Sequence, residues 1–325
     1  MQATQAILRS AGGPEAIEWA DVELGRPGPG QALVVHSAVG VNFIDVYHRT
    51  GAYPAPLPAG LGLEAAGQVI AVGDGVTEVG PGDRVVTFGP ERGAYSTARL
   101  VSAASLIKLP DDMDDDTAAA IMLKGCTTEF LVERCARLQP GDDVLVHAAA
   151  GGVGQLLVQW LTAIGARVIA HVGSEAKAQL VRDLGTADVL SIPFDQIAEE
   201  VRALTGGNGV RATFDGVGKA SWDASLKSTA RRGLIASFGS ASGPVDGVAL
   251  GILAQHGSLY VSRPTLFDYY AMPEDRSAGS ERLFAMIREG KIKATIGQRY
   301  PLTDAAQAHR DLEARNTTGA TLLIP

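Results

Sequence analysis

Short alternating runs of hydrophobic and polar residues fill the first 110 positions of the chain. The runs at 32–35, 68–72 and 84–87 are rich in valine, and clusters of Gly, Pro and Asp separate them. Alternation with a period of two, interrupted at short intervals by turn residues, is typical of β-strands in barrels and sandwiches. The spacing of these strands predicts a β-barrel.

From about position 126 the pattern changes to strands that alternate with helices. Residues 144–146 and 167–170 form short apolar strands, and between them apolar residues recur at helical spacing. Further strand-like runs follow at 187–190, 210–214 and 233–238, and glycines occur in the loops after several of the strands. This alternation predicts a parallel sheet with a ligand over the carboxyl ends of its strands.

The loop between the first of these strands and its helix carries the most informative pattern. Ala149, Gly151 and Gly154 occupy the three positions of a G-x-G-x-x-G pattern, with alanine in the first, and Gly152 adds another glycine. A turn without bulky side chains lets the backbone approach a pyrophosphate, which the N–H groups and dipole of the helix N-terminus then bind. The pattern favours a dinucleotide site, although a plain tight turn would also need small residues.

The tip of the second strand indicates which dinucleotide binds. An NAD site usually places Asp or Glu there to bind the ribose 2′-hydroxyl, but this strand ends with His171, Val172, Gly173 and Ser174. Ser174 can donate to a phosphate, and Lys177 supplies positive charge one turn into the next helix. Glu175 lies between them and opposes this charge. The balance favours NADPH over NADH.

Composition is that of a soluble globular protein of 325 residues, with 46% hydrophobic and 20% charged residues. The net charge of −8 offers no basic surface for nucleic acid or an anionic membrane. The uncharged stretch 144–164 is long enough to span a bilayer, but its glycines and glutamines indicate a strand and an amphipathic helix instead. The N-terminus shows no signal peptide, so we expect a cytoplasmic protein.

Two other features are better explained by a structural role than by a functional one. Cys126 and Cys135 are expected on one helical segment, too far apart to bridge, and we interpret them as inert thiols. The acidic run at 111–116 could be a metal or protein site. It is better explained as charge that complements the N-terminal dipole of a helix beginning near Thr117.

With these features in view, the chain resembles the medium-chain dehydrogenase/reductase superfamily. Within it, the chain is most similar to the zinc-free quinone oxidoreductases related to zeta-crystallin, and in particular to the bacterial NADPH:quinone reductases. The resemblance covers nearly the whole length. It rests on the motifs at 40–45, 62–67, 82–85, 124–127, 148–154, 237–239 and 319–325.

The resemblance implies an α/β fold, in which a Rossmann doubly wound parallel sheet is joined to a GroES-like β-barrel catalytic domain, with the active site in the cleft. The GroES-like domain would comprise 1–125 and 267–325, and the Rossmann domain 126–266. Family members commonly pair through an edge strand, so a homodimer through 259–261 is expected. Zinc-dependent relatives have histidine where this chain has Leu63, and the cysteine ligands are also missing, so no metal site is expected.

The resemblance also assigns roles to individual residues. Asn42, Tyr47 and Tyr53 would be the catalytic residues, although a loop tyrosine is more often a packing or surface residue. Relatives often have tyrosine where this chain has Ile192, which could weaken NADPH binding. The implied cofactor-binding residues are Asn42, Thr127, Gly151, Gly152, Val153, Gly154, Gly173, Ser174, Lys177, Phe238, Gly239, Ser240, Ser262, Arg263 and Arg315.

The expected activity is NADPH-dependent reduction of a quinone, or of another electron-poor conjugated carbonyl, by direct metal-free hydride transfer. Such acceptors need little Lewis-acid help because the added charge delocalises onto their oxygens, so positioning and a few hydrogen bonds can supply most of the catalysis. Two alternatives remain open. One is an enone or alkenal double-bond reductase on the same fold, and the other is a non-catalytic, NADPH-binding structural protein.

Overall fold

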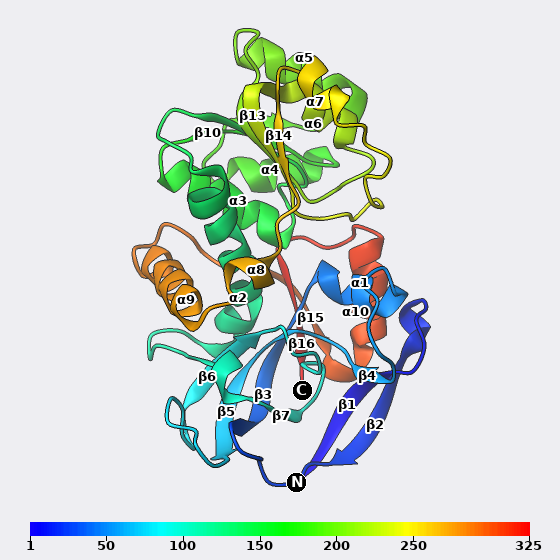
Figure 1. Cartoon of the computed structure of the whole chain (residues 1–325), viewed down its shortest axis with the longest axis vertical. Coiled ribbons are helices and arrows are strands. Elements are labelled where there is room, and N and C mark those ends of the chain that lie inside the picture. Colours follow the sequence, from blue (N-terminus) through cyan, green and yellow to red (C-terminus); the bar gives the residue numbers. More distant parts are fainter. The chain divides into compact units, whose positions relative to one another are not determined.

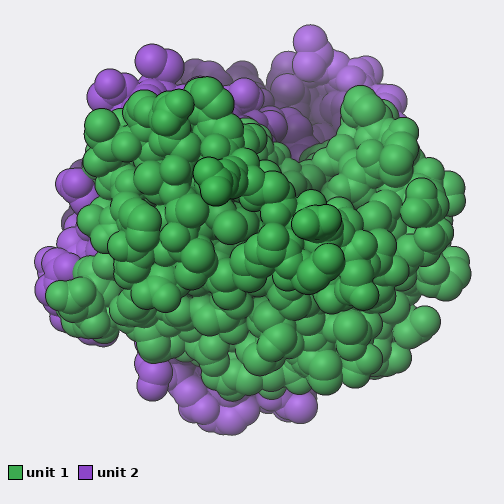
Figure 2. All heavy atoms as spheres, turned by 90° about the horizontal axis from the view of Figure 1, so that it is seen from below, with its two compact units in different colours: residues 1–124, 276–280, 294–325 green, residues 125–275, 281–293 purple.

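The computed structural model describes residues 1–325 (Figure 1). Contacts divide the chain into two compact units, which Figure 2 colours green and purple. Unit 1 comprises Met1–Lys124, Arg276–Ser280 and Ala294–Pro325, and unit 2 comprises Gly125–Asp275 and Glu281–Lys293.

This division differs from the predicted domain limits in the C-terminal part of the chain. The sequence assigned all of 267–325 to the first domain, whereas the contacts share this stretch between the units. The physical reason is visible at Arg134, whose Nη1 donates to the carbonyl of Tyr269 and to the carboxylate of Asp275. Residues 267–275 therefore pack as part of unit 2.

Unit 1 is built mainly from β-strands, as the alternating pattern predicts. Their bounds are β1 (Gln2–Leu8), β2 (Ile17–Glu23), β3 (Gln31–Val41), β4 (Ala59–Gly60), β5 (Glu64–Val72), β6 (Arg84–Phe88), β7 (Ala98–Ser102), β8 (Ile107–Lys108), β15 (Ile296–Pro301) and β16 (Ala320–Ile324). A three-stranded sheet has the order β2-β1-β4. A seven-stranded sheet has the order β15-β16-β3-β5-β6-β8, with β7 paired to β3.

The alternation along these strands determines which side chains form the core of unit 1. Val34 pairs with Val69 across β3 and β5, and both are buried in one cluster with Val85 and Val101. Because successive side chains of a strand point to opposite faces, the intervening residues face the other side of the sheet. The strands predicted at 32–35, 68–72 and 84–87 are confirmed.

Helices of unit 1 connect or follow the strands. Their bounds are η1 (Pro14–Ala16), α1 (Phe43–Thr50), η2 (Ala103–Ser105), η4 (Leu302–Asp304) and α10 (Ala305–Glu313). Helix α1 begins after Asn42, whose backbone N–H donates to Asp45 Oδ2 at 2.9 Å, and ends at Gly51 in a left-handed conformation with φ 79°. These two caps confine the helix to a short segment of the loop between β3 and β4.

Helix α2 (Asp115–Glu129) contains the boundary between the units and continues into a π-helical segment, η3 (Phe130–Ala136). The side chain of Asp114 accepts the backbone N–H of Thr117 at 2.7 Å, and Asp115 and Asp116 lie in the first turn. The acidic run therefore complements the helix N-terminus, as the sequence indicated. It also forms ion pairs, between Asp115 and Arg84 and between Asp116 and Arg299.

Unit 2 contains a six-stranded parallel sheet. Its strands are β9 (Asp143–Val146), β10 (Arg167–His171), β11 (Asp188–Leu190), β12 (Val210–Asp215), β13 (Thr229–Ser237) and β14 (Tyr260–Ser262), and their order is β11-β10-β9-β12-β13-β14. The predicted parallel sheet is confirmed. Only strand ends differ, since β13 begins at Thr229 rather than at 233 and ends one residue before Phe238.

The helices of unit 2 are α3 (Gly152–Ala163), α4 (Glu175–Arg182), α5 (Phe194–Leu204), α6 (Trp222–Ser228), α7 (Gly251–Gln255) and α8 (Leu266–Tyr269), together with α9 (Pro273–Arg288), which has its middle in unit 1. The chain starts the sheet at β9 in the middle and proceeds outward to β11. It then returns to β12 and proceeds to β14. The strand order therefore reverses between β9 and β12, and in doubly wound sheets ligands bind at this point.

Two predictions about segments are also resolved. The uncharged stretch 144–164 forms β9 and α3, and none of the helices combines the length and apolarity that crossing a membrane requires. Both cysteines are free thiols, Cys126 being buried and Cys135 half-buried.

Candidate active-site residues

The turn between β9 and α3 is shaped by backbone contacts. His147 N–H donates to the carbonyl of Phe214 on β12, and Ala149 N–H donates to the carbonyl of His171 on β10. Ala148, between them, has a left-handed backbone with φ 52°. The turn is thus anchored to both neighbouring strands and reverses at an alanine, one residue before the pattern that the sequence highlighted.

Helix α3 begins inside this turn and presents its first amides. No protein acceptor is found for the N–H groups of Gly152, Val153 and Gly154, as expected for the first turn of a helix. A Cβ at Gly154 would lie only 2.4 Å from the carbonyl oxygen of Ala148, so the helix can start this close to the turn only with glycine. Free amides at a helix N-terminus over a bulk-free turn fit a pyrophosphate.

The end of β10 provides the second part of the cofactor site. Gly173 is exposed and a Cβ there would meet nothing within 4 Å, while Ser174 is the N-cap of α4. Glu175, which opposed a phosphate in the sequence argument, forms an ion pair with Arg182 at 2.7 Å. This pairing offsets part of its negative charge beside Ser174 and Lys177.

Two further loops meet at the ends of β12 and β13. A Cβ at Gly239 would lie 2.5 Å from the carbonyl oxygen of Gly216, and one at Gly216 would lie 2.9 Å from the ring of Phe238. Arg263, which directly follows β14, donates from Nη1 to the carbonyl of Ser237 at 2.9 Å. The structure therefore gathers the residues at 151–154, 173–177, 237–240 and 262–263 at the carboxyl ends of neighbouring parallel strands.

In unit 1, Asn42 belongs to a buried polar cluster around Glu64. The fully buried carboxylate of Glu64 accepts Asn42 Nδ2–H at 2.8 Å, Lys124 Nζ–H at 3.0 Å and the backbone N–H of Leu123 at 2.7 Å. One amide hydrogen of Asn42 is thus committed to Glu64, and the second is left for another acceptor. Sequence reasoning missed Glu64 as the partner of Asn42 and Lys124 as the partner of Glu64, although both lie within the motifs that carried the resemblance.

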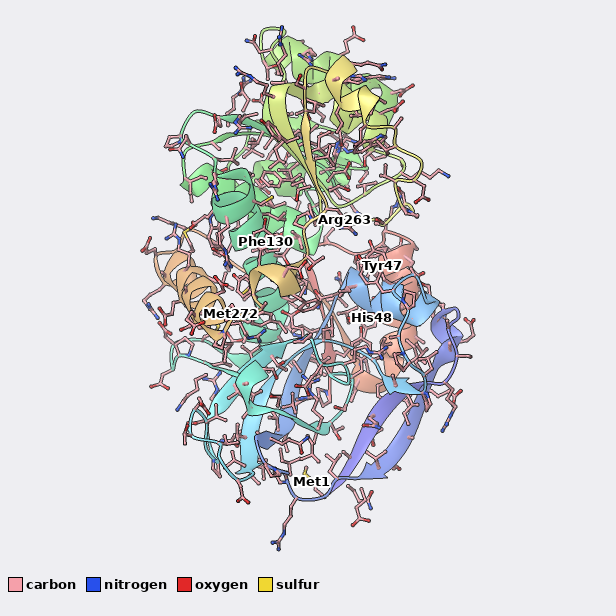
Figure 3. The ribbon with its side chains drawn as sticks, viewed as in Figure 1. Met1, Tyr47, His48, Phe130, Arg263 and Met272 are labelled. Atoms are coloured by element: carbon pink, nitrogen blue, oxygen red, sulfur yellow. The ribbon has the colours of Figure 1, made fainter.

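The predicted tyrosines lie together. The rings of Tyr47, on α1, and Tyr53, in the loop after it, have centroids 5.0 Å apart, and the ring of Phe43 lies 5.3 Å from that of Tyr47. Tyr47 and His48 both belong to α1 (Figure 3), and the ring of His48 is 6.0 Å from that of Tyr53. These side chains form an aromatic surface on α1 and its following loop that suits a planar ligand.

The remaining predicted residues lie on separate elements. Thr127 is a buried residue of α2 in unit 2, whereas Arg315 follows α10 in unit 1 and has a left-handed backbone with φ 61°. Ile192 is half-buried against an apolar cluster that includes Leu145 and Ile169. Its aliphatic side chain packs on the core. It therefore offers no hydrogen bond in place of the one that a tyrosine hydroxyl could make to the cofactor.

A second buried network lies behind α1. Tyr95 O–H donates to Asp45 Oδ2 at 3.0 Å, and the Tyr95 oxygen is 2.9 Å from His309 Nε2. Arg49 Nη1 lies 3.1 Å from His309 Nδ1 and can only donate, so Nδ1 is the acceptor and Nε2 carries the proton of the neutral ring. Burial raises the pKa of Asp45 to about 7, although its hydrogen bonds oppose this shift.

This raised pKa predicts a pH dependence of stability. Between pH 3.8, the ordinary pKa of the group, and about pH 7, Asp45 binds more protons in the folded than in the unfolded protein, so its contribution to the free energy of unfolding falls as pH rises. Asp45→Asn removes the ionisation. We expect this variant to gain on the order of 3 kcal/mol relative to the wild type between pH 4 and pH 8, measured by urea unfolding. A difference that stays constant with pH would contradict the assignment.

Two family models match two parts of this chain. The family model for the alcohol dehydrogenase GroES-like domain matches residues 28–111, and that for zinc-binding dehydrogenases matches residues 152–271. The fold and these models define a medium-chain dehydrogenase/reductase. A quinone oxidoreductase of Pseudomonas aeruginosa is 47% identical over 97% of both chains.

Other relatives agree over nearly the full length. A crystal structure of Escherichia coli quinone oxidoreductase complexed with NADPH is 43% identical, covers 99% of this chain and 100% of its own, and superposes with a TM-score of 0.96. A 2-haloacrylate reductase of a Burkholderia species is 40% identical over 98% of both chains. The chain belongs to the quinone oxidoreductase family of the medium-chain dehydrogenases/reductases. The predicted resemblance and the predicted pair of GroES-like and Rossmann folds are confirmed.

Proposed function

We propose that this protein reduces quinones with NADPH by direct hydride transfer. The arrangement at the carboxyl ends of β9 and β10 carries the proposal. These two strands are parallel neighbours, so the three free amides of α3 lie at the same end of the sheet as Ser174 and Lys177. No carboxylate stands at the tip of β10 to bind a ribose 2′-hydroxyl. The names of the relatives and the NADPH in the Escherichia coli structure support the same conclusion.

In this proposal, Gly151–Gly154 bind the pyrophosphate, and Gly173, Ser174 and Lys177 bind the 2′-phosphate. NADPH, when bound, supplies the hydride. The loops after β13 and β14, with Phe238, Gly239, Ser240, Ser262 and Arg263, bind the rest of the dinucleotide, and Thr127 and Arg315 are assigned to it by the family resemblance alone.

On the acceptor side, Asn42 and the tyrosines have distinct roles. The amide hydrogen of Asn42 that is not bonded to Glu64 donates to the oxyanion that develops on the acceptor. Tyr47 and Tyr53 present ring faces and hydroxyls to a planar acceptor. The final proton comes from solvent.

We propose that this chemistry proceeds without a metal. Leu63 is fully buried and apolar at the position where zinc-dependent relatives have histidine. The structure brings together no group of three or more His, Cys, Asp or Glu side chains that could hold an ion, and zinc sites need three or four such ligands. The kinds of side chain that lie close together therefore support the proposal of a metal-free reaction.

A second candidate is reduction of an activated carbon–carbon double bond. It is favoured by the 2-haloacrylate reductase among the relatives, whose named substrate is a conjugated acid. The same hydride donor would serve either acceptor, so the distinction depends on the acceptor side.

An acceptor screen tests both candidates. Chelator-treated protein is mixed with NADPH and with 1,4-benzoquinone, 1,4-naphthoquinone, a 2-alkenal or 2-chloroacrylate, and NADPH absorbance is followed; each assay is repeated with NADH. We expect the quinones to react fastest and NADPH to be preferred. Faster reaction with the alkenal or the haloacrylate would favour the second candidate, and no oxidation with any acceptor would refute both.

We further propose a cytoplasmic homodimer without nucleic-acid or membrane partners. The two free cysteines support a reducing, cytoplasmic location. The net charge of −8 supports the absence of nucleic-acid and membrane partners. Strand β14 is the edge of the parallel sheet and leaves Tyr260 64% and Val261 38% exposed. Leu259 was expected to share this interface, but it is 6% exposed and packs with Leu226 and Ile235, so it belongs to the core.

The edge strand yields a test of the dimer. Tyr260→Asp combined with Val261→Lys is expected to produce monomers in sedimentation velocity with little change in melting temperature, because both residues are exposed. Leu259→Asp instead buries an unpaired charge and is expected to destabilise the fold by several kcal/mol. A double variant that sediments like the wild type would argue against pairing through β14.

A further inference from the structure

Asp215, at the end of β12, is a buried hub that the proposed mechanism does not use. Its side chain is 1% exposed. Oδ1 accepts the backbone N–H groups of Val217 at 2.9 Å and Gly218 at 3.0 Å, and both carboxylate oxygens accept from Ser221 Oγ. One carboxylate therefore shapes the whole loop after β12.

The same carboxylate reaches the neighbouring strand through a serine. Ser225 Oγ, on α6, donates to Asp215 Oδ2 at 2.6 Å and lies 3.1 Å from His147 Nε2. A carboxylate only accepts, so the single hydroxyl hydrogen of Ser225 is committed to Asp215. His147 Nε2 must therefore carry a proton and donate it to the Ser225 oxygen. Hydrogen bonds are therefore donated in one direction only, from His147 to Ser225 and from Ser225 to Asp215.

His147 connects these hydrogen bonds to the cofactor turn. It is 1% exposed and directly precedes Ala148, whose left-handed backbone begins the turn toward Gly151–Gly154. Its backbone N–H also donates to the carbonyl of Phe214, next to Asp215. The two ends of this hydrogen-bonded series, His147 and Asp215, therefore lie at β9 and β12, where the strand order reverses.

We propose that His147, Ser225 and Asp215 are positioning residues that hold the glycine turn in the geometry that binds NADPH. The inference rests on the proposed function for the identity of the cofactor. None of the three contacts the pyrophosphate amides; they act through the backbone of Ala148 and through the loop 215–218. If Ser225 loses its hydroxyl, the His147 N–H becomes a buried donor without an acceptor, and a shift of the ring toward another acceptor would relieve this cost. That movement displaces the turn.

The test compares two serines of α6. Ser225→Ala removes the link, whereas Ser228→Ala removes an equally buried hydroxyl whose oxygen has no hydrogen-bond partner. We expect Ser225→Ala to raise the Kd for NADPH about 10- to 100-fold and to leave kcat at saturating NADPH and the KM for the quinone within about twofold. Ser228→Ala should leave all three unchanged. Calorimetry measures Kd, and steady-state rates measure the split between KM and kcat.

A second pair of variants separates positioning from folding. His147→Gln keeps an N–H donor at similar reach and should retain most of the NADPH affinity, whereas His147→Leu should lose it to the same extent as Ser225→Ala. If Ser225→Ala and His147→Leu lower the melting temperature but bind NADPH as tightly as the wild type, the positioning role is refuted. If the wild type itself does not bind NADPH, the proposed function fails instead.

Discussion

Gly154→Ala is expected to weaken NADPH binding by at least about 100-fold. The new Cβ would lie 2.4 Å from Ala148 O and 2.7 Å from Ala149 Cα, and both are backbone atoms that cannot rotate away. Helix α3 must therefore retreat from the turn, which moves the amides of Gly152 and Val153 away from the pyrophosphate. Titration calorimetry with NADPH measures the loss.

The matched control is Gly251→Ala, in the same unit. Gly251 is the first residue of α7, and a Cβ there would meet nothing within 4 Å. This change should leave NADPH binding unaltered and stabilise the protein slightly, because alanine restricts the unfolded chain. Circular dichroism must show that the Gly154 variant remains folded. Wild-type affinity in a folded Gly154→Ala protein would refute the assignment of this turn to the cofactor.

Lys124→Met is expected to destabilise unit 1 strongly. It leaves the carboxylate of Glu64, which is fully buried, without its cation, and breaking one side of a buried ion pair costs about 3–5 kcal/mol. The hydrogen bond that Asn42 donates to Glu64 would then have to accommodate an uncompensated charge, so the rate with quinone should fall as well. Urea unfolding and the acceptor assay measure the two effects.

An exposed lysine in the same unit provides the control. Lys108 pairs with Asp83 at 3.0 Å, but its side chain is 56% exposed, so Lys108→Met should cost at most about 1 kcal/mol. Adding Glu64→Gln to Lys124→Met should recover part of the lost stability, because the buried side chain at position 64 is then neutral. Equal costs for the two lysines would mean that the Glu64 carboxylate is not isolated from solvent.

The sequence determined the local architecture of this protein. Apolar alternation placed the strands that became β3, β5 and β6, and apolar spacing separated β9, α3 and β10, because both patterns follow from how side chains project from a regular backbone. The glycine turn could be recognised for the same reason. Its function depends on consecutive residues, and so does that of Ser174 as the N-cap of α4.

The family motifs extended the predictions to individual residues of the proposed site, but not to their partners. Asn42 was among the predicted residues, whereas its hydrogen bond to Glu64, 22 residues away, was not predicted. Glu175 was correctly noticed as an opposing charge, but its pairing with Arg182 depends on where two side chains of α4 point. Leu259 was assigned to an interface because the sequence does not state which face of an edge strand is covered.

Only the tertiary structure decided which distant polar groups share one buried environment. Arg49 and His309 are 260 residues apart, and Ser225 and His147 are 78 apart, yet each pair is within hydrogen-bond distance. Periodicity along a chain specifies the conformation of each segment and the face that it buries. Which polar side chains then meet is decided by sheet order and helix packing, because a buried donor or acceptor must find its partner wherever the fold brings one within reach.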